Sequence, residues 1–313
     1  MKKRFSFLTA ADAITIVFVL VLSILEGIFF LRIADAGIYL VANTALALFI
    51  FFSALHCENK RDRRNLFIGF LHDWYLVPAI LFIYTQSSSI AFPIHQRDYD
   101  AVLISIDRWM FGTDPTAWIS RFAHPLLTEI LQLAYSSYYL FFILLFIELY
   151  RRNDRKDFFY GGMLIVYGFY LSYIGYLLVP AVGPRFTLHN FFSINEELPG
   201  LFFTPLLRAV INSGGGIPAD SLHPLAAVHR DAFPSGHTEL TLTAIYLAFR
   251  TGVKSRWFIA VTGTLLILST VYMRYHYVID VLSGIGFFFF TVWSGKYLHC
   301  WWNKNRETNF LPT

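Results

Sequence analysis

Residues 276–297 read HYVIDVLSGIGFFFFTVWSGKY, an apolar run with a histidine and an aspartate at its start. A helix needs about 20 predominantly apolar residues to cross the hydrocarbon core of a membrane, and this run is long enough. Similar apolar runs lie upstream, at about 12–32, 36–55, 66–86, 127–149, 158–181, 235–250 and 257–274. The sequence therefore predicts an all-α polytopic membrane protein with about eight transmembrane helices.

The composition favours the same fold class. Of the 313 residues, 56% are hydrophobic and only 15% are charged, whereas soluble domains have about 25% charged residues. This balance excludes a disordered chain, a collagen-like repeat and a small disulfide scaffold, and it argues against a soluble domain. The run at 12–32 follows Met1-Lys2-Lys3-Arg4, as in a signal peptide, but it is longer than such a sequence requires. The extra length favours an uncleaved span.

The basic residues predict the orientation of the spans. With a cytoplasmic N-terminus, eight spans place every lysine and most arginines in the inner segments. Cytoplasmic loops of membrane proteins carry such an excess of lysine and arginine. We therefore expect cytoplasmic N- and C-termini in a plasma or inner membrane. The net charge of +4 is then a topology signal and indicates no nucleic-acid partner. Cys57 and Cys300 fall near the inner face and have no metal-ligand spacing.

A helix start with polar residues precedes the sixth apolar run. Its sequence is Pro234-Ser235-Gly236-His237. Proline suits a first helical turn, serine suits a cap, and glycine lets a ligand approach the backbone. The free amides of a helix N-terminus attract anions, phosphate above all. The segment predicts an anion-binding helix start that carries an imidazole, although a Pro-Ser-Gly start is also a common structural feature.

A second polar segment, Arg274-Tyr275-His276-Tyr277-Val278-Ile279-Asp280, joins the last two spans on the outer side. His276 and Asp280 are four residues apart and share one face of a helix. A carboxylate there can hold one ring nitrogen and leave the other unprotonated and nucleophilic. The alternative is a structural hydrogen bond, but an aspartate within a span is costly and is usually functional.

A third polar element, Arg185, ends the fifth span in Pro180-Ala181-Val182-Gly183-Pro184-Arg185. It is either an interfacial anchor or a guanidinium that binds a phosphate. The predicted topology places Arg185, the 234–237 helix start and the 274–280 segment on the same membrane face. Because they come from three separate hairpins, we expect them to form one site.

Two outer segments are long. In 87–126, apolar residues recur at helical spacing around Asp98, Asp100, Asp107 and Arg108, which predicts either an amphipathic helix on the membrane surface or a helix packed on the bundle. The segment 182–232 contains Ser213-Gly214-Gly215-Gly216 and is either a lid over a site or a long loop.

The polar segments resemble the type 2 phosphatidic acid phosphatase superfamily of lipid phosphate phosphatases. That family carries Lys-x6-Arg-Pro, then Pro-Ser-Gly-His, then Ser-Arg-x5-His-x3-Asp. The second motif matches at 234–237, and the third matches at His276 and Asp280. The resemblance implies a six-helix phosphatase-like core at 127–297. The two spans in 1–65 and the outer segment at 87–126 are additions. The third helix and that outer segment make up 66–126, and 298–313 is a cytoplasmic tail.

Some motif positions depart from the family. Leu178 stands where the first motif has lysine, Phe186 follows Arg185, and Thr270 replaces the arginine of the third motif. Arg274 is placed to supply the missing charge. This form resembles the branch that includes inositol phosphorylceramide synthases, which transfer a phosphorylated head group between lipids. Hydrolysis and transfer therefore both stay open.

The resemblance implies a phosphohistidine mechanism on the outer face. His276 attacks phosphorus, Asp280 orients it, and His237 is the general acid and then the general base. Arg185, Arg274, Ser235 and the amides near Gly236 hold the phosphoryl oxygens, with no metal and no cofactor. The expected partners are a lipid phosphate and the bilayer, and the oligomeric state is open. A transporter is the competing class, but its polar groups would gather at the midplane and its halves would repeat.

Overall fold

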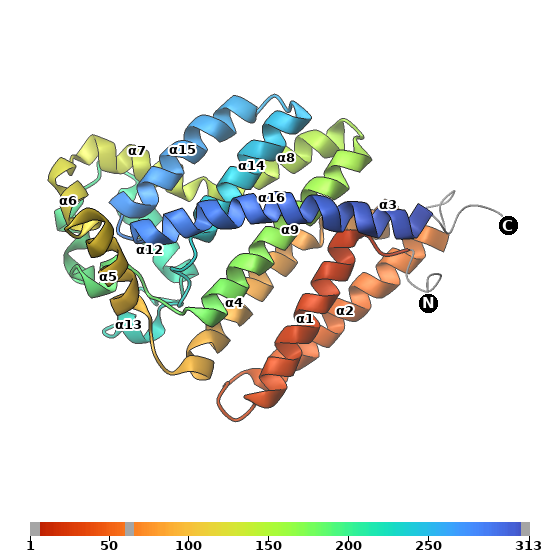
Figure 1. Cartoon of the computed structure of the whole chain (residues 1–313), viewed down its shortest axis with the longest axis horizontal. Coiled ribbons are helices and arrows are strands. Elements are labelled where there is room, and N and C mark those ends of the chain that lie inside the picture. Colours follow the sequence, from red (N-terminus) through yellow and green to blue (C-terminus); the bar gives the residue numbers. More distant parts are fainter. Residues whose placement is uncertain (1–6, 60–65, 308–313) are drawn as a thin grey trace.

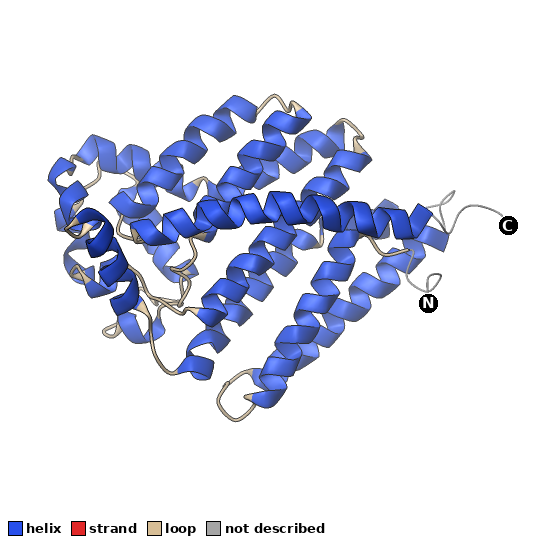
Figure 2. Ribbon diagram, viewed as in Figure 1, coloured by secondary structure: helices blue, strands red, loops and turns tan. Residues whose placement is uncertain are grey.

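The computed structural model describes residues 7–59 and 66–307, and within these ranges it contains helices and connecting segments but no strand (Figure 2). The prediction of an all-α protein is confirmed. Each of the eight predicted apolar runs is at least partly helical.

The helices differ widely in length. The long ones are α1 (Ala10–Ile28), α2 (Ala36–Asn59), α4 (Leu76–His95), α9 (Arg155–Leu178) and α16 (Val278–Glu307). Those of intermediate length are α3 (Leu66–Trp74), α5 (Asp100–Phe111), α7 (Pro125–Ser136), α8 (Tyr138–Arg151), α12 (Thr204–Gly214), α14 (Gly236–Thr251) and α15 (Arg256–Tyr272). The short elements are α6 (Pro115–Ile119), α10 (Pro184–Thr187), α11 (Ile194–Glu197), α13 (Pro224–Ala227) and the 3-10 turns η1 (Ser120–Phe122) and η2 (Phe191–Ser193).

In the described part of the chain, five helices are long and apolar enough to cross a membrane, namely α1, α2, α4, α9 and α16. A sixth span exists if α7 and α8, which meet at 47°, count as one. These helices identify an integral membrane protein. The expected number of eight is not confirmed, because α14 has 16 residues and α15 has 17.

Two spans differ from their predicted positions for local reasons. The third span is not at 66–86, because α3 ends at Trp74 and the spanning helix is α4. Pro78 lacks an amide hydrogen and therefore belongs in the first turn of α4. The run 127–149 is broken at Ser136-Ser137, where both hydroxyls donate to backbone carbonyls of the preceding turn. Side-chain bonds of this kind are a usual cause of helix bending.

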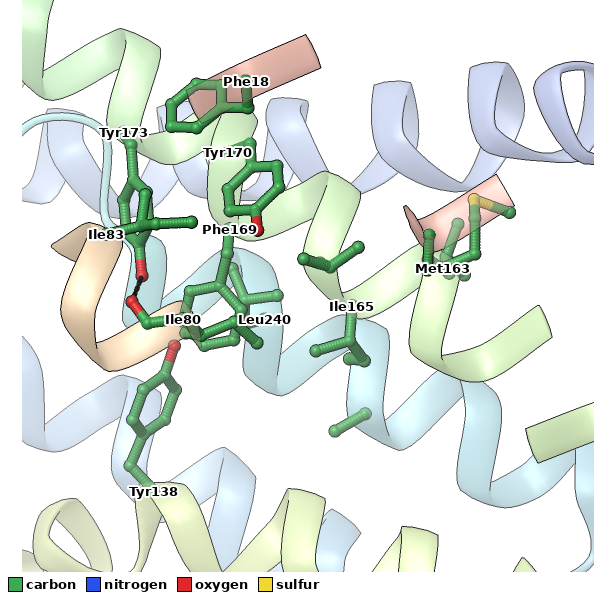
Figure 3. Packing of buried hydrophobic residues seen from close by; sticks show 14 of the residues in the cluster. Phe18, Ile80, Ile83, Tyr138, Met163, Ile165, Phe169, Tyr170, Tyr173 and Leu240 are labelled. Carbon is green, nitrogen blue, oxygen red and sulfur yellow. Dashed lines mark hydrogen bonds between the residues drawn. The ribbon is translucent and has the colours of Figure 1, made fainter. Parts of the chain in front are cut away.

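Helix α9 forms the centre of the bundle. It is apolar on all sides, and α1, α4, α8, α14 and α16 pack against it (Figure 1). Phe18 of α1 stacks on Tyr170 at a centroid distance of 4.3 Å. On another side the hydroxyl of Tyr173 donates to the carbonyl of Ile80 in α4 at 3.1 Å (Figure 3). A helix that is hydrophobic all round is a buried one.

The two ends of the bundle differ. Helices α5, α6, α12 and α13 gather at one end (Figure 1). At the other end the start of α1 meets the last turns of α16, where the indole nitrogen of Trp302 donates to the carbonyl of Leu8 at 3.1 Å. The loops between α8 and α9 and between α14 and α15, which carry Arg152 and Lys254, also belong to this second end. The basic residues at 2–4 and 60–64 lie outside the described residues.

The first long outer segment contains α5, which packs on α16. Leu103 is buried, whereas Val102 and Trp109 are exposed. Asp100 and Asp107 also lie on the buried face, because both accept backbone hydrogen bonds from neighbouring loops. Of the two interpretations of 87–126, the structure supports the helix packed on the bundle.

The second long outer segment, 182–232, is anchored to the bundle at several points. The Glu129 carboxylate of α7 accepts the amides of residues 201–204 and the hydroxyl of Thr204. The buried guanidinium of Arg208 donates to the carbonyls of Ile194 and Leu198. The segment therefore forms a fixed cap over this end, which we call the cap end.

Candidate active site

The start of α14 forms one wall of the site. Ser235 is its N-cap, and the hydroxyl accepts the amide of Thr238 at 3.3 Å. A side chain at 236 would clash, because a Cβ there would lie 2.2 Å from the hydroxyl oxygen of Tyr176. Ser235 is fully buried as a helix cap. The amides of Gly236 and His237 are in the first turn, where a helix leaves its donors without intrahelical partners.

His276 lies in the loop between α15 and α16, with its side chain buried. Its Nδ1 is 2.7 Å from the carbonyl oxygen of Ala232. Because a carbonyl only accepts, Nδ1 must carry the hydrogen. The neutral ring then has its lone pair on Nε2, the state of a histidine nucleophile.

Asp280 lies in the first turn of α16 and is fully buried. One carboxylate oxygen accepts the amide of Tyr277 at 2.8 Å and is 3.5 Å from Nδ1 of His276. The sequence predicted that this carboxylate holds the ring nitrogen. In the structure the shorter contact of Nδ1, at 2.7 Å, is with the carbonyl of Ala232, and the Asp280 carboxyl lies farther from the same nitrogen, at 3.5 Å. Its backbone carbonyl accepts the amide of Ser235 at 3.0 Å, which joins the two motifs.

His237 faces the same place from α14. Its ring centroid is 5.7 Å from that of His276. The ring also lies against Tyr135 of α7 and Tyr138 of α8, at 4.7 and 4.5 Å. These two tyrosines stand on either side of the bend between α7 and α8. The bend therefore helps to position the second histidine.

The loop before α10 brings Arg185 to the site. Its amide donates to the carbonyl of Arg274 at 3.0 Å. Gly183 has a φ of 90°, and a Cβ there would be 2.5 Å from the carbonyl oxygen of Tyr275. The close contact between the two loops thus requires glycine. The guanidinium of Arg185 donates to Asn212 at 2.8 Å and lies 4.9 Å from the ring centre of Tyr275.

Arg274 is buried and has a φ of 65°, which is rare for a residue with a side chain. Its guanidinium is paired with the carboxylate of Glu197 in α11. The bond from Arg274 lowers the pKa of Glu197. Burial, together with the charge of Arg274, lowers the pKa of nearby His189 to about 4. His189 is therefore neutral at pH 7, and Arg274 has an acidic partner that the sequence analysis missed.

Two aspartates of α5 hold the loops of the site together, and sequence reasoning missed this role. Asp100 accepts the amides of Val182 and Gly183 and the hydroxyl of Tyr277. It thus ties the Arg185 loop to the His276 loop. Burial raises the pKa of Asp100. The seven-residue spacing of Asp100 and Asp107 places both on one helix face, and this spacing could have predicted that they act together.

Asp107 caps the helix that carries Asp280. Its two carboxylate oxygens accept the amides of Val278 and Ile279, both at 2.9 Å. Burial raises the pKa of Asp107 as well. A carboxylate at a helix N-terminus satisfies free amides and matches the positive end of the helix dipole.

Asp231 is a further carboxylate that the sequence analysis did not single out. It precedes Ala232, the acceptor for His276, and it lies within electrostatic range of His237. The hydroxyl of Tyr84 in α4 donates to Asp231 at 2.6 Å and is 3.1 Å from Nδ1 of His229. His229 is therefore part of a half-buried network with Tyr84 and Asp231.

The predicted site residues meet at the cap end. The 234–237 helix start, His276, Asp280 and Arg185 are joined by the contacts above, and Arg274 adjoins them through its carbonyl. Among residues 7–59 and 66–307, no group of three or more His, Cys, Asp or Glu side chains has the geometry to hold a metal ion. The fold and site define a class, a polytopic helical membrane protein with two facing histidines beside arginines and a helix start.

Comparison with known protein families assigns the chain to a superfamily. The model of the PAP2 superfamily matches residues 101–294, more than half of the chain, and the chain belongs to this superfamily. A PA-phosphatase related-family protein of Dictyostelium discoideum is 30% identical over 183 residues. That region is 52% of this chain and 31% of the relative, so the chain spans about a third of that relative's length. No solved structure matches the chain. The resemblance inferred from the motifs is confirmed for the superfamily.

Proposed function

We propose that this protein is a membrane lipid phosphatase that hydrolyses a phosphomonoester or diphosphate of a lipid through a phosphohistidine intermediate. The observation that carries the proposal is the state of His276. Its Nδ1 donates to the carbonyl of Ala232, and the ring of His237 is 5.7 Å away, centre to centre. One imidazole is thus prepared as a nucleophile, and a second lies where a proton donor is needed.

In the first step Nε2 of His276 attacks phosphorus. The bond from phosphorus to the leaving oxygen breaks, and His237 gives that oxygen a proton. The ring of His276 becomes positively charged, and the carboxylate of Asp280, 3.5 Å from Nδ1, stabilises this charge. Arg185, Arg274 and the amides at the α14 start hold the phosphoryl oxygens, which is the main requirement in phosphoryl transfer.

In the second step a water molecule attacks the phosphohistidine. The neutral His237 accepts a proton from the water, the nitrogen–phosphorus bond breaks, and inorganic phosphate leaves. His276 returns to its neutral form, and His237 is again protonated for the next cycle. If a lipid hydroxyl replaces the water, the same steps transfer the phosphoryl group instead. The half-buried Asp231, whose charge acts on His237, supports transfer as a second candidate function, because a carboxylate can accept a hydrogen bond from the hydroxyl of a lipid acceptor.

We place the site on the outer face, periplasmic or extracellular, and both termini in the cytoplasm. At the end opposite the site, the described loops carry Arg152 and Lys254, and the helix ends that flank them carry Arg151 and Arg256. An excess of basic residues marks the cytoplasmic side of a membrane protein. Cysteine labelling with a membrane-impermeant reagent in intact cells tests this orientation.

The central test uses the purified full chain with radiolabelled lipid phosphates, with and without an alcohol acceptor. We expect phosphate release and an acid-labile, base-stable labelled protein after rapid quenching. His276→Gln should abolish both signals, lowering turnover by roughly 10⁴-fold or more. Transfer of label to the alcohol without phosphate release would favour the transferase. Full activity in His276→Gln would overturn the proposal.

A further inference from the structure

Asp231 is a carboxylate beside the site that the two steps of hydrolysis do not use. It is half-buried in the loop before α14, six residues ahead of His237. The hydroxyl of Tyr84 in α4 donates to its carboxylate at 2.6 Å. Arg230, the preceding residue, pairs instead with Asp98 at 3.3 Å. The charge of Asp231 is therefore not cancelled by the cation next to it in the sequence.

The hydrogen bonds around Asp231 form a chain with one direction. A carboxylate only accepts, so the single hydroxyl hydrogen of Tyr84 lies between Tyr84 and Asp231. Nδ1 of His229, 3.1 Å from the same hydroxyl oxygen, must then donate to it. Burial lowers the pKa of His229, so this ring is neutral at pH 7. The carboxylate of Asp231 is therefore the only charged group of the three.

The backbone that follows Asp231 is fixed to the rest of the site. The amide of Ala232 donates to the carbonyl of Ala181 at 3.1 Å, and the carbonyl of Ala232 is the acceptor for His276. Farther along, the amide of Ser235 donates to the first turn of α16 at 3.0 Å. With Tyr84 on its side chain and these bonds on its backbone, the loop holds the Asp231 carboxylate in one place relative to the start of α14.

His237 is supported in a different way from His276. Its ring lies against Tyr135 and Tyr138, whereas neither ring nitrogen has a hydrogen-bond partner in the part of the chain that the structure describes. Without such a partner, nearby charges decide whether the ring is protonated. The two charged groups that act on it are His276 and Asp231. Of these two, only Asp231 is negative and favours the protonated ring.

Other titratable groups also lie around His237. They are Tyr135 of α7, Tyr138 of α8, Tyr176 of α9, Glu239 of α14 itself, and Arg185, Tyr275 and Asp280 of the neighbouring loops and helix start. None of them is changed in the variants compared below. A difference between the wild type and a variant at position 231 therefore reports the charge at that position.

We propose that Asp231 is a positioning residue whose carboxylate keeps His237 protonated as the general acid, and that Tyr84 of α4 holds this carboxylate in place. The proposal rests on the proposed function, because it assigns a support to the proton donor of that mechanism. Tyr84 precedes residue 101, so α4 contributes to the site from outside the region that matches the family.

The first test measures kcat/KM of the purified full chain against pH, with dioleoyl phosphatidic acid or farnesyl diphosphate, whichever the wild type hydrolyses faster. A general acid works only while it is protonated, so activity falls at the pH at which His237 loses its proton. Asp231→Asn removes the negative charge and makes this proton easier to lose. The basic limb of the profile should therefore move down by about one pH unit. Asp231→Glu restores the charge and should return the limb to within about half a unit of the wild type.

Tyr84→Phe should move the basic limb in the same direction by a smaller amount, because the released carboxylate turns toward water. Since Tyr84 acts through Asp231, the double variant should behave as Asp231→Asn does by itself. Two control variants match these changes. Asp220→Asn removes an exposed carboxylate of the cap, and Tyr39→Phe removes a hydroxyl that donates to Ser89 of α4. Both controls should leave the limb within about 0.2 pH unit, because exposed charges are largely screened by salt.

A lower kcat in Asp231→Asn with an unmoved basic limb would overturn the proposal and leave the phosphatase intact, since Asp231 would then only shape the loop. If Asp231→Asn does not fold, Tyr84→Phe and Asp231→Glu decide, and an unmoved limb in Tyr84→Phe rejects the role of Tyr84. Shifts that add in the double variant reject it as well.

Absence of hydrolysis of both lipids by the wild type would instead overturn the proposed function. In that case the protonation of His237 is measured directly, by NMR of the protein with ¹⁵N-labelled histidines and with His237→Gln for assignment. The ring should lose its proton at a lower pH in Asp231→Asn than in the wild type. The same titration in both proteins would reject the role of Asp231.

Discussion

Two buried histidine–aspartate pairs lie at opposite ends of the helix bundle. Nδ1 of His276 is 3.5 Å from Asp280, and Nε2 of His72 is 3.3 Å from Asp12. Asp280 lies in the first turn of α16, whereas Leu8, which precedes α1 and Asp12, is hydrogen-bonded to Trp302 in the last turns of α16. By distance and burial the two pairs are nearly alike.

Their surroundings differ. The carboxylate of Asp12 accepts the amide of Thr9 at 2.7 Å and the hydroxyl of Tyr75 at 2.8 Å, so both oxygens have partners. Asp280 instead keeps one buried oxygen without a hydrogen-bond partner. His276 also has a second histidine, a helix start and arginines near it. A buried histidine–aspartate pair is therefore weak evidence of catalysis by itself. The stronger evidence is that a second histidine, a helix start and arginines lie near the same pair.

The largest difference in effect is expected when the histidine of each pair, one at each end of the helix bundle, is replaced. His237→Gln removes the proton donor of the proposed mechanism and should lower kcat by about 10²- to 10⁴-fold, the usual contribution of general acid–base catalysis. His72→Gln should leave kcat on a short-chain lipid phosphate within about twofold, because His72 is far from the site. Steady-state phosphate release measures both. Similar losses in the two variants would contradict the distinction between the ends.

The aspartates give the next test. Asp280→Asn removes the carboxylate beside His276 and should lower kcat by roughly 100- to 10,000-fold, the upper value being that of Asp→Asn in a serine-protease triad. Asp12→Asn should instead destabilise the protein by about 1–3 kcal/mol through unsatisfied buried groups. Thermal unfolding in detergent and kcat, measured on both variants, separate the two effects. Loss of kcat in Asp12→Asn at unchanged stability would contradict the assignment of a purely structural role to Asp12.

A smaller effect is expected from Asp100 of α5. Asp100→Asn keeps the shape but weakens the bonds to Val182, Gly183 and Tyr277, which tie two site loops together. We expect kcat to fall by about tenfold with KM changed less, because misplacement of catalytic groups reduces rate more than binding. The loss should exceed that of Asp98→Asn, whose carboxylate accepts from Arg230. Equal effects would assign Asp100 to the general stability of the cap.

The smallest effect concerns Glu197. Its pKa is lowered by Arg274, so the ion pair is intact above the ordinary value of 4.5 and is lost as the pH falls through the lower folded value. Glu197→Gln frees Arg274 at all pH values. Inhibition by inorganic phosphate should then strengthen about two- to fivefold near pH 7, as expected for an ion pair whose carboxylate is exposed and which is worth up to about 1 kcal/mol. If phosphate inhibition is unchanged, Arg274 does not reach the phosphate.

The all-α class could be predicted from the sequence alone. The sequence also predicted that the three polar segments lie at one end of the bundle. Apolar runs identify spans directly, and the basic loops place Arg185, Pro234–His237 and His276 at one end. The number of spans was not predictable, because α14 and α15 are shorter than a typical crossing and the Ser136-Ser137 break divides a run. At the α3–α4 break, the hydroxyl of Tyr75 donates to Asp12, a contact over 63 residues that leaves no local pattern.

The supporting groups of the site were harder to predict for a different reason. Asp100 contacts Tyr277, which is 177 residues away, and Glu197 contacts Arg274, which is 77 residues away. Such pairings depend on how the cap folds over the bundle and leave no periodic signal. Asp231 is similar, since its partner Tyr84 lies in a helix that precedes the family's matched region.

The capping of α16 by Asp107 also bears on biosynthesis. A ribosome makes α5 well before α16, and chains fold as they emerge. The amides of Val278 and Ile279, which donate to Asp107, are made 171 and 172 residues after it. The same late segment supplies Asp280, whose carbonyl anchors Ser235. A chain terminated before α16 would therefore lack Asp280 and the carbonyl that anchors Ser235, so the site assembles only after α16 has been made.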